Sequence, residues 1–356
     1  MKTLCQVIRH KIEKNGLLPF AQFMELALYC PEYGYYEQQK DNVGPRGDFY
    51  TSVSTGELFG QLLAFQFAAW LGKLRIANCE LRIVEAGAHD GKLAKDILIW
   101  LRLNRPELFS EIEYLILEPS ARRREWQRQT LAGFSNVRWL DSQLSTLNSQ
   151  LNGVIFSNEL LDAMPVHRFG WDAAQKTWFE WGVALDGEKF VWAKIPDSQF
   201  TIRNSQLESV LPDGYTIETS PAAENWWRAA AGRLARGKLV AIDYGFTADD
   251  LFSPARPRGT LRAYHRHHVT DDLLANPGEQ DLTAHVNFSA IQAAGEAAGL
   301  KTGPFTTQTR FLTEILGNAT KDKTFGDWNA SRTRQFQTLT HPEHLGRAFH
   351  VLVQSK

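Results

Sequence analysis

From residue 81 onward, short apolar runs alternate with stretches of helical periodicity, and no other feature of the sequence restricts the fold as strongly. Strands that alternate with helices form a parallel sheet with helices on both faces. Strands buried on both faces read as continuous apolar runs, as these do. We therefore expect an α/β protein with a doubly wound core. The predicted strands are residues 81–85, 114–118, 137–140, 154–157 and 238–242.

The rest of the chain divides around this core. Residues 1–74 have helical spacing of their apolar residues, so they predict an N-terminal helical cap. Asp186-Gly187 between two aromatic runs predicts a tight β-hairpin within an insertion at 171–236, which also holds a helix. The core then comprises residues 75–170 and 237–356. Residues 303–312 and 348–353 are expected to close the sheet as antiparallel strands.

Charge and composition exclude several partners. The 39 Lys and Arg residues nearly balance the 40 Asp and Glu residues, so no global positive field exists to hold nucleic acid or an anionic membrane. No apolar run approaches the ~20 residues of a spanning helix. The three cysteines are widely spaced and form no C-x-x-C motif, which favours a reducing compartment. We expect a cytoplasmic protein with no membrane or nucleic-acid partner.

The strongest local signal is the turn from Glu85 to Gly91, between the first strand and the following helix. Its glycines, Gly87 and Gly91, allow a ligand to approach the backbone, and the start of the helix faces whatever is bound. The pattern is incomplete as a dinucleotide motif, because His89 stands where a glycine is usual. A glycine turn with a purely structural role is the alternative.

Acidic or polar residues follow several successive strands. The prediction of a ligand site therefore does not depend on the glycine turn alone. Ligands of open α/β sheets bind at the carboxyl edge, where these side chains converge. A carboxylate at Glu118 can accept both hydroxyls of a ribose, whereas Glu85 would repel a pyrophosphate. S-adenosylmethionine, which has a ribose and an ammonium but no phosphate, therefore fits better than a nicotinamide cofactor. Each acid alone has a second interpretation, as a helix cap or a solvated strand end. The residues are Glu85, Glu118, Asp141, Asn158 and Glu159.

Several short motifs occur in order along nearly the whole chain. They are Gly34-Tyr35-Tyr36, Gly47-Asp48-Phe49-Tyr50-Thr51-Ser52, Phe59-Gly60, Ser157-Asn158-Glu159-Leu160-Leu161-Asp162-Ala163-Met164-Pro165-Val166, Ile242-Asp243-Tyr244-Gly245 and Asp281-Leu282-Thr283-Ala284-His285-Val286. Together they resemble S-adenosylmethionine-dependent methyltransferases related to the mitochondrial complex I assembly-factor arginine methyltransferase.

The resemblance implies a class I methyltransferase fold: a Rossmann-like seven-stranded sheet, an N-terminal helical cap and an inserted β-hairpin subdomain. It also implies methylation of a protein arginine, with a respiratory complex subunit as one candidate substrate. Two departures are the missing second glycine of the turn and Asn287 in place of the usual acid.

Arginine is permanently protonated, so a site that methylates it should present carboxylates that grip the guanidinium. We expect catalytic roles for Glu159 and Asp162, just after the fourth strand, and for Asp48 in the glycine-rich loop. Capping of the following turn by Asn158 and Asp162 is the alternative. The expected cofactor-binding residues are Gly47, Phe49, Thr51, Glu85, Gly87, Gly91, Glu118, Asp141 and Asn158.

The histidines at 265, 267, 268 and 285 invite a zinc interpretation. We predict no metal, because no cysteine stands near them and Arg262 and Arg266 would oppose a cation. Alternatives to a protein methyltransferase are a cofactor-binding assembly or chaperone-like protein without catalysis, a small-molecule methyltransferase and a nicotinamide dehydrogenase. A homo-oligomer is compatible with the sequence.

Overall fold

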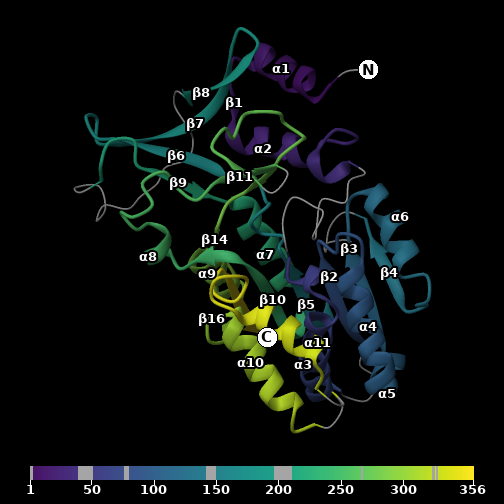
Figure 1. Cartoon of the computed structure of the whole chain (residues 1–356). Coiled ribbons are helices and arrows are strands. Elements are labelled where there is room, and N and C mark those ends of the chain that lie inside the picture. The colour runs from purple at the N-terminus through teal and green to yellow at the C-terminus, as the bar shows by residue number, and fades with distance from the viewer. Residues whose placement is uncertain are drawn as a thin grey trace.

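The computed structural model describes residues 3–38, 51–75, 80–141, 150–195, 211–265, 268–322, 325 and 328–356. Figure 1 shows a large sheet layered between helices, with two smaller sheets and the first two helices beside one end of it. Among the described residues, none of the helices combines the length and the apolar character needed to cross a bilayer.

The large sheet contains the five predicted strands. They are β2 (Leu81–Ala86), β3 (Ile112–Leu117), β4 (Val137–Leu140), β5 (Leu151–Asn158) and β10 (Leu234–Phe246), and they pair in parallel in the order β10-β5-β2-β3-β4. The predicted last strand is β17 (Phe349–Ser355), which pairs antiparallel with β10. Short strands β14 (Val286–Asn287), β15 (Lys301–Thr302) and β16 (Thr306–Thr307) complete it. The described residues thus form a nine-stranded sheet, whereas seven strands were expected.

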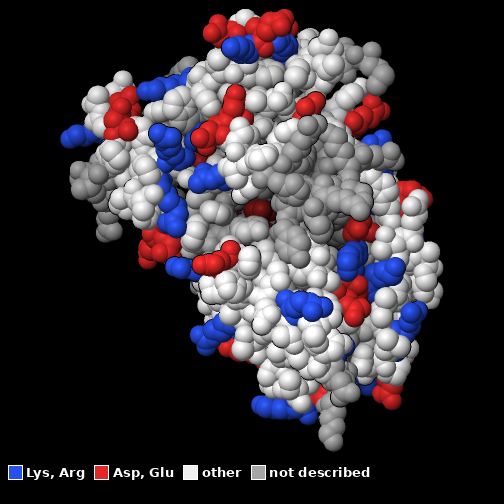
Figure 2. Space-filling model, viewed as in Figure 1, with Lys and Arg blue, Asp and Glu red and all other residues white. Residues whose placement is uncertain are grey.

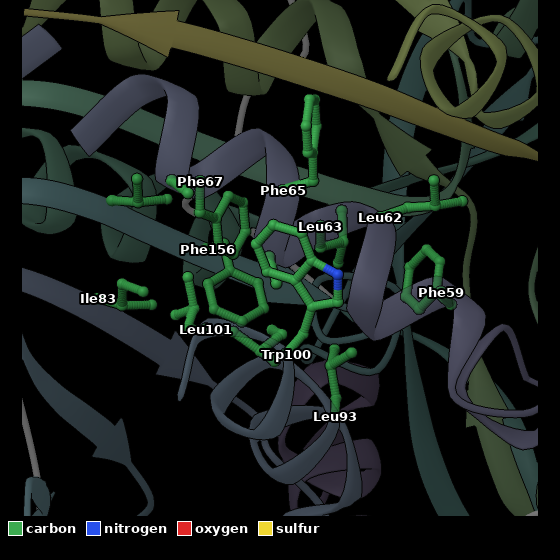
Figure 3. Close-up of a cluster of buried hydrophobic side chains, with 14 of the residues drawn as sticks. Phe59, Leu62, Leu63, Phe65, Phe67, Ile83, Leu93, Trp100, Leu101 and Phe156 are labelled. Carbon is green, nitrogen blue, oxygen red and sulfur yellow. The ribbon is translucent and has the colours of Figure 1, made fainter. Parts of the chain in front are cut away.

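Helices cover both faces of this sheet because its strands are apolar on both sides. On one face, α3 (Leu58–Leu74), α4 (Lys92–Asn104) and α10 (Gln308–Ala319) contribute to one core (Figure 3). On the other face, α7 (Pro221–Arg233) and α9 (Phe288–Ala297) contribute to a second core. Successive residues of β2 separate accordingly: Ile83 belongs to the first core and Val84 to the second. Further helices in this part of the molecule are α5 (Pro106–Glu111), α6 (Ala121–Thr130), α8 (Ala248–Leu251), α11 (Ala330–Thr340) and the short η2 (Val53–Thr55).

These cores do not follow the expected domain boundaries. Helix α3 lies within the expected cap, 1–74, yet its apolar residues pack on the large sheet with α4. Helix α7 lies within the expected insertion, 171–236, yet it packs on the opposite face of the same sheet. The sequence alone could not predict where α3 and α7 pack, because helical periodicity identifies the apolar face of a helix but not the element that this face contacts.

The inserted hairpin is confirmed as β7 (Thr177–Asp186) and β8 (Lys189–Ile195). It belongs to a five-stranded sheet with β1 (Leu18–Pro19), β6 (His167–Asp172) and β9 (Thr216–Thr219). A three-stranded sheet lies nearby, formed by β11 (Arg262–His265), β12 (His268–Thr270) and β13 (Asp281–Thr283). Helices α1 (Leu4–Asn15) and α2 (Phe20–Tyr29), followed by η1 (Tyr35–Glu37), share a third core with these two sheets.

The prediction of a strand over 303–312 is wrong for its second half. Helix α10 begins at Gln308, and the side chain of Thr307 caps it by accepting a hydrogen bond from the backbone N–H of Arg310. Phe311, Leu312 and Ile315 then bury one helical face in the first core. Helical periodicity over the longer segment therefore decides the structure, and only Thr306–Thr307 pairs with β17.

Candidate functional site

A cavity of about 1160 Å³ lies at the carboxyl edge of the large sheet. Its lining comes from the ends of β2, β3 and β5, from the N-terminal helices and from the small sheet that contains β11 and β13. Figure 2 shows a hollow in this face of the molecule with acidic atoms at its floor. The cavity has two parts. We call its lining residues between 85 and 93 and between 117 and 126 the turn side. The carboxylate side is lined by Tyr29, Tyr36, Asn158, Glu159, Leu160, Asp162, Ala163, Met164, Tyr244, Thr260, Arg262, Tyr264, Asp281, Thr283, Ala284 and His285.

The register of the parallel strands brings the predicted acids to one edge. Leu117, Ala86, Ser157 and Ala241 lie side by side across β3, β2, β5 and β10. The residues that follow these positions therefore lie at the same edge of the four parallel strands, although β10 itself continues to Phe246, paired with β17 as far as Tyr244. Glu118 comes one residue beyond this row, and Glu159 and Asp243 come two residues beyond it.

On the turn side, Glu85 is almost fully buried, with 2% of its surface exposed. The hydroxyl of Tyr114 on β3 donates to its carboxylate across 2.7 Å. Burial raises the pKa of Glu85 to about 8, and the hydrogen bond from Tyr114 opposes that rise. Tyr114 thus fixes the Glu85 side chain at the cavity wall.

The turn after β2 adopts the backbone conformation that its glycines allow. Gly87 has φ +76°, and a Cβ there would lie 3.0 Å from Cδ1 of Leu160. His89 also has a positive φ, +47°, and its carbonyl accepts a hydrogen bond from Nε2 of Gln127 on α6. Gly91 has φ +84° and begins α4, where a Cβ would lie 3.3 Å from Leu131. Gly87 therefore lines the cavity, whereas Gly91 allows α4 to pack against α6.

The carboxylate of Glu118 is held by two hydrogen bonds from residues that follow it closely in the chain. Its Oε1 accepts the backbone N–H of Ser120 across 3.0 Å, and its Oε2 accepts Nε2 of Gln127 across 3.1 Å. Burial raises its pKa, although the charge of Arg123 and these hydrogen bonds oppose the rise. The side chain is only 4% exposed and still borders the cavity. A fixed carboxylate of this kind suits a ligand that donates two hydroxyls.

On the carboxylate side, Glu159 follows β5 with a strained backbone. Its φ is +53°, unusual for a residue with a side chain, and its backbone N–H donates to the carbonyl of Ile242 across 3.0 Å. Its carboxylate accepts Nδ2 of Asn158 across 2.9 Å and the backbone N–H of Ser52. Burial raises the pKa of Glu159 to about 8, against these two hydrogen bonds. Such strain at a cavity wall is typical of functional residues.

Asp243 holds the loop that carries Glu159. Its Oδ2 accepts the backbone N–H groups of Leu160, at 3.1 Å, and Leu161, at 2.8 Å. Burial raises its pKa to about 7, and these backbone hydrogen bonds oppose the rise. Asp162, at the end of the same loop, lines the cavity, and burial together with the charge of Asp243 raises its pKa well above the ordinary range. Asp243 therefore positions the loop, and Glu159 and Asp162 face the cavity.

The opposite wall of the carboxylate side comes from distant parts of the chain. Tyr29 and Tyr36, from α2 and η1, lie with their rings 5.5 Å apart. The hydroxyl of Tyr29 donates to the carbonyl of Ala163, and that of Tyr36 donates to Oδ1 of Asp281. Tyr244 and Tyr264 also line this side of the cavity. The wall is therefore rich in tyrosine hydroxyls and carboxylates.

The structure brings most of the predicted site residues together. Gly91 and Asp141 are not among the cavity-lining residues; Asp141 is exposed after the edge strand β4. Gly47, Asp48 and Phe49 lie outside the described residues. Asp243 was missed, although it is an acid at the end of a predicted strand, the same signal that identified Glu118. The predicted residues that line the cavity are Thr51, Glu85, Gly87, Glu118, Asn158, Glu159 and Asp162.

The histidines have other contacts. Nδ1 of His265 lies 2.8 Å from the carbonyl oxygen of Glu279, and His267 lies outside the described residues. His285 borders the cavity, and burial lowers its pKa to about 4, so its ring is neutral near pH 7. Asn287 caps α9 by accepting the backbone N–H of Ala290. Its lack of a carboxylate is thus compatible with a structural role.

Known proteins resemble this chain over nearly its whole length. A family model of S-adenosyl-L-methionine-dependent methyltransferases matches residues 62–306. The mitochondrial protein arginine methyltransferase NDUFAF7 of Rattus norvegicus is 28% identical, over 96% of this chain and 82% of the relative. The Drosophila melanogaster homolog is 26% identical, over 98% of this chain and 84% of the relative.

Solved structures agree with the sequence comparisons. A Burkholderia thailandensis protein crystallised with S-adenosyl-homocysteine is 33% identical and superposes with a TM-score of 0.83, covering 99% of this chain and 92% of the other. A native structure of a Burkholderia thailandensis protein is 34% identical, with a TM-score of 0.80 over 99% of this chain and 91% of the other. These similarities confirm the α/β methyltransferase fold.

One expectation about location is contradicted. The sequence predicted a cytoplasmic protein, whereas the relatives from rat, fly and human are named as mitochondrial proteins. The prediction relied on the cysteine pattern and on the absence of a long apolar run. Neither feature distinguishes the cytoplasm from other reducing compartments.

Proposed function

Because this chain belongs to the family of S-adenosyl-L-methionine-dependent methyltransferases, we propose that it methylates an arginine side chain of a protein. It is an enzyme whose cofactor is S-adenosylmethionine. The observation that carries the arginine assignment is the pair of cavity-lining carboxylates, Glu159 and Asp162, on a loop at the carboxyl edge of the sheet.

The turn side suits the cofactor. Glu118, held by Ser120 and Gln127, would accept the ribose hydroxyls, and Gly87 would let the cofactor approach the backbone. Glu85, Asn158 and Thr51 also line the cavity. The bound cofactor supplies an activated methyl group on a sulfonium. We extend these roles to Gly47 and Phe49 as a proposal from the motif alone.

The carboxylate side suits a cationic acceptor. A cavity of about 1160 Å³ exceeds the ~300–1,000 Å³ usual for one small ligand, which leaves room for an arginine side chain beside the cofactor. Glu159 and Asp162 would orient the guanidinium so that one nitrogen faces the methyl group. Transfer would form an N–C bond as the S–C bond of the sulfonium breaks, and that nitrogen would lose a proton. A carboxylate with a pKa near 8, such as that of Glu159, is suited to take it.

The relatives support a protein as the acceptor, because the curated ones are named protein arginine methyltransferases. A respiratory complex subunit is our candidate substrate. We further propose that the protein assembles into a homo-oligomer and that Asp48 has a catalytic role.

Mass spectrometry of proteins from cells with and without this gene tests the proposal. We expect at least one methyl-arginine to disappear in the deletion and to return when the wild-type gene is restored. A gene with the substitution Glu159→Gln should not restore it. If every methyl-arginine persists in the deletion strain, arginine is not the acceptor, and the small-molecule alternative gains support.

A further inference from the structure

The short helix η1, near the N-terminus, lies against the turn that carries Glu118. Glu37 is the last residue of η1 and lines the cavity together with Glu118. Its carboxylate is hydrogen-bonded to Ser120, from which it is 83 positions distant in the chain. Glu37 has no part in the proposed function described above.

The hydroxyl of Ser120 has two partners. It donates its proton to Oε2 of Glu37 across 2.8 Å. The same oxygen accepts the backbone N–H of Arg123 across 3.2 Å, and Ser120 thereby caps the start of α6. A hydroxyl has one proton to donate, so Glu37 is the acceptor that completes the hydrogen bonding of this buried side chain.

The main chain of Ser120 holds the carboxylate that we assign to the ribose. Its backbone N–H donates to Oε1 of Glu118 across 3.0 Å. Ser120 thus contacts two cavity-lining carboxylates, Glu118 through its backbone and Glu37 through its side chain. A rotation of Ser120 that broke its bond to Glu37 would also move the N–H on which Glu118 depends.

Helix η1 is itself bound to the first turn of α6. The side chain of Arg122 donates to the carbonyl oxygen of Glu37, and Nε of Arg123 donates to that of Tyr36 across 2.9 Å. The guanidinium of Arg123 also lies 5.0 Å from the centre of the Tyr36 ring. Glu37 therefore presents its carboxylate to Ser120 from a fixed backbone.

Attachment of η1 does not by itself explain the side chain of Glu37. The bonds from Arg122 and Arg123 go to main-chain carbonyls, which are the same whichever side chain stands at position 37. The carboxylate of Glu37 adds a charge-assisted hydrogen bond to the one residue that also holds Glu118. The two carboxylates are close: burial raises the pKa of Glu118, and the charge of Glu37 adds to that rise.

We propose that Glu37 is a further positioning residue of the cofactor site, which acts through Ser120 to hold Glu118 in the orientation that accepts the ribose hydroxyls of S-adenosylmethionine. This inference rests on the role of Glu118 in the proposed function and does not depend on the nature of the methyl acceptor. It assigns to the N-terminal segment a part in binding the cofactor.

Calorimetry with S-adenosyl-homocysteine tests the assignment, with its 2′,3′-dideoxy analogue as a probe that lacks both ribose hydroxyls. The full-length protein is used throughout. The variants are Glu37→Ala, which removes the acceptor of the Ser120 hydroxyl, and Glu37→Gln, which keeps a neutral oxygen there. The matched control is Glu25→Ala, an exposed acid on α2 outside the cavity lining.

We expect the wild-type protein to bind S-adenosyl-homocysteine more tightly than the dideoxy analogue. Glu37→Ala should weaken binding of S-adenosyl-homocysteine by about three- to tenfold and leave affinity for the dideoxy analogue unchanged, which also verifies folding. Glu37→Gln should lose less, because its amide oxygen still accepts the hydroxyl. In the Glu118→Ala background, Glu37→Ala should add no further loss, since the residue that it positions is absent. The control should behave as wild type.

The results separate this inference from the proposed role of Glu118. If Glu118→Ala weakens binding of S-adenosyl-homocysteine and Glu37→Ala does not, the inference is wrong and the role of Glu118 stands. If Glu118→Ala has no effect, both are wrong. Equal losses for the two ligands in Glu37→Ala would show that Glu37 supports the cavity wall in general, and equal losses in Glu37→Ala and Glu37→Gln would show that the hydrogen bond to Ser120 is not the cause; either result overturns the inference.

Discussion

The two sides of the cavity are built differently. The turn side comes from consecutive strand, turn and helix segments, with Glu85 and Gly87 after β2 and Glu118 after β3. The carboxylate side joins residues from distant parts of the chain; Tyr29 and Asp281, for example, are 252 positions apart. If the cofactor and the acceptor bind as we propose, local sequence determines the contacts of the cofactor, whereas the tertiary fold determines the contacts of the acceptor.

The largest effect that distinguishes the two sides is expected for Glu159→Gln. The substitution keeps the shape of the side chain and removes the charge that, as we propose, orients the guanidinium. We expect the methyl-transfer rate to fall by about 10²-fold or more, with affinity for S-adenosylmethionine nearly unchanged. Transfer is measured on the substrate that the deletion experiment identifies. Glu279→Gln, at an exposed position, serves as the control.

A wild-type transfer rate in Glu159→Gln would contradict the assignment of different roles to the two sides of the cavity. It would mean that the carboxylate side does not bind the acceptor through this residue.

The second prediction concerns the pH dependence of binding on the carboxylate side. A cationic probe, N-butylguanidinium, should respond to pH, whereas a neutral probe of similar shape, N-butylurea, should not. Burial raises the pKa of Glu159 to about 8 and that of Asp243 to about 7. In the empty cavity a raised pKa keeps a carboxyl neutral near pH 7, and a bound guanidinium would favour its ionised form, so that the carboxyl releases its proton on binding. Binding of butylguanidinium should therefore strengthen as pH rises from about 6 to 8, by up to about tenfold per pH unit for one proton released.

Neighbouring groups should not reverse this trend. His285, with a pKa of about 4, is already neutral over that range. Burial raises the pKa values of Tyr29, Tyr36 and Tyr244, so these tyrosines stay protonated. Calorimetry at several pH values measures the effect, with butylurea as the probe that should not respond. A pH-independent affinity for butylguanidinium would show that binding releases no proton from the acids.

The third prediction addresses the turn side. Glu118→Ala removes the carboxylate that we assign to the ribose, so affinity for S-adenosylmethionine should weaken by about 1–3 kcal/mol. Butylguanidinium binding should change little by comparison. Glu125→Ala removes an exposed carboxylate from the nearby α6 and is the matched control. Unchanged calorimetric affinity for the cofactor in Glu118→Ala would remove this residue from the site.

The difference between local and long-range determinants also explains which features could be predicted from the sequence alone. The predicted strands agree with β2, β3, β4, β5, β10 and β17 because continuous apolar runs identify doubly buried strands. Residues such as Glu118 and Glu159 could be found because parallel strands end at one edge. Tyr36 and Asp281 stand in motifs that the resemblance singled out, but no local pattern indicates that they lie together, as their hydrogen bond shows. The pairing of α3 and α7 with the large sheet was missed for the same reason: apolar periodicity does not name a partner.

The smallest effect is expected at Asp141, which the sequence assigned to the cofactor together with Glu118. Both residues follow neighbouring parallel strands, but β4 lies at the edge of the sheet and Asp141 is exposed, outside the cavity lining. An exposed side chain without such a role usually changes free energies by less than about 0.5 kcal/mol. Asp141→Ala should therefore alter cofactor affinity far less than Glu118→Ala in the same calorimetric assay. A loss of cofactor affinity as large as that of Glu118→Ala would instead show that the turn side extends to the end of β4. Residues that follow each of the neighbouring parallel strands β2, β3 and β4 would then all contribute to the cofactor site.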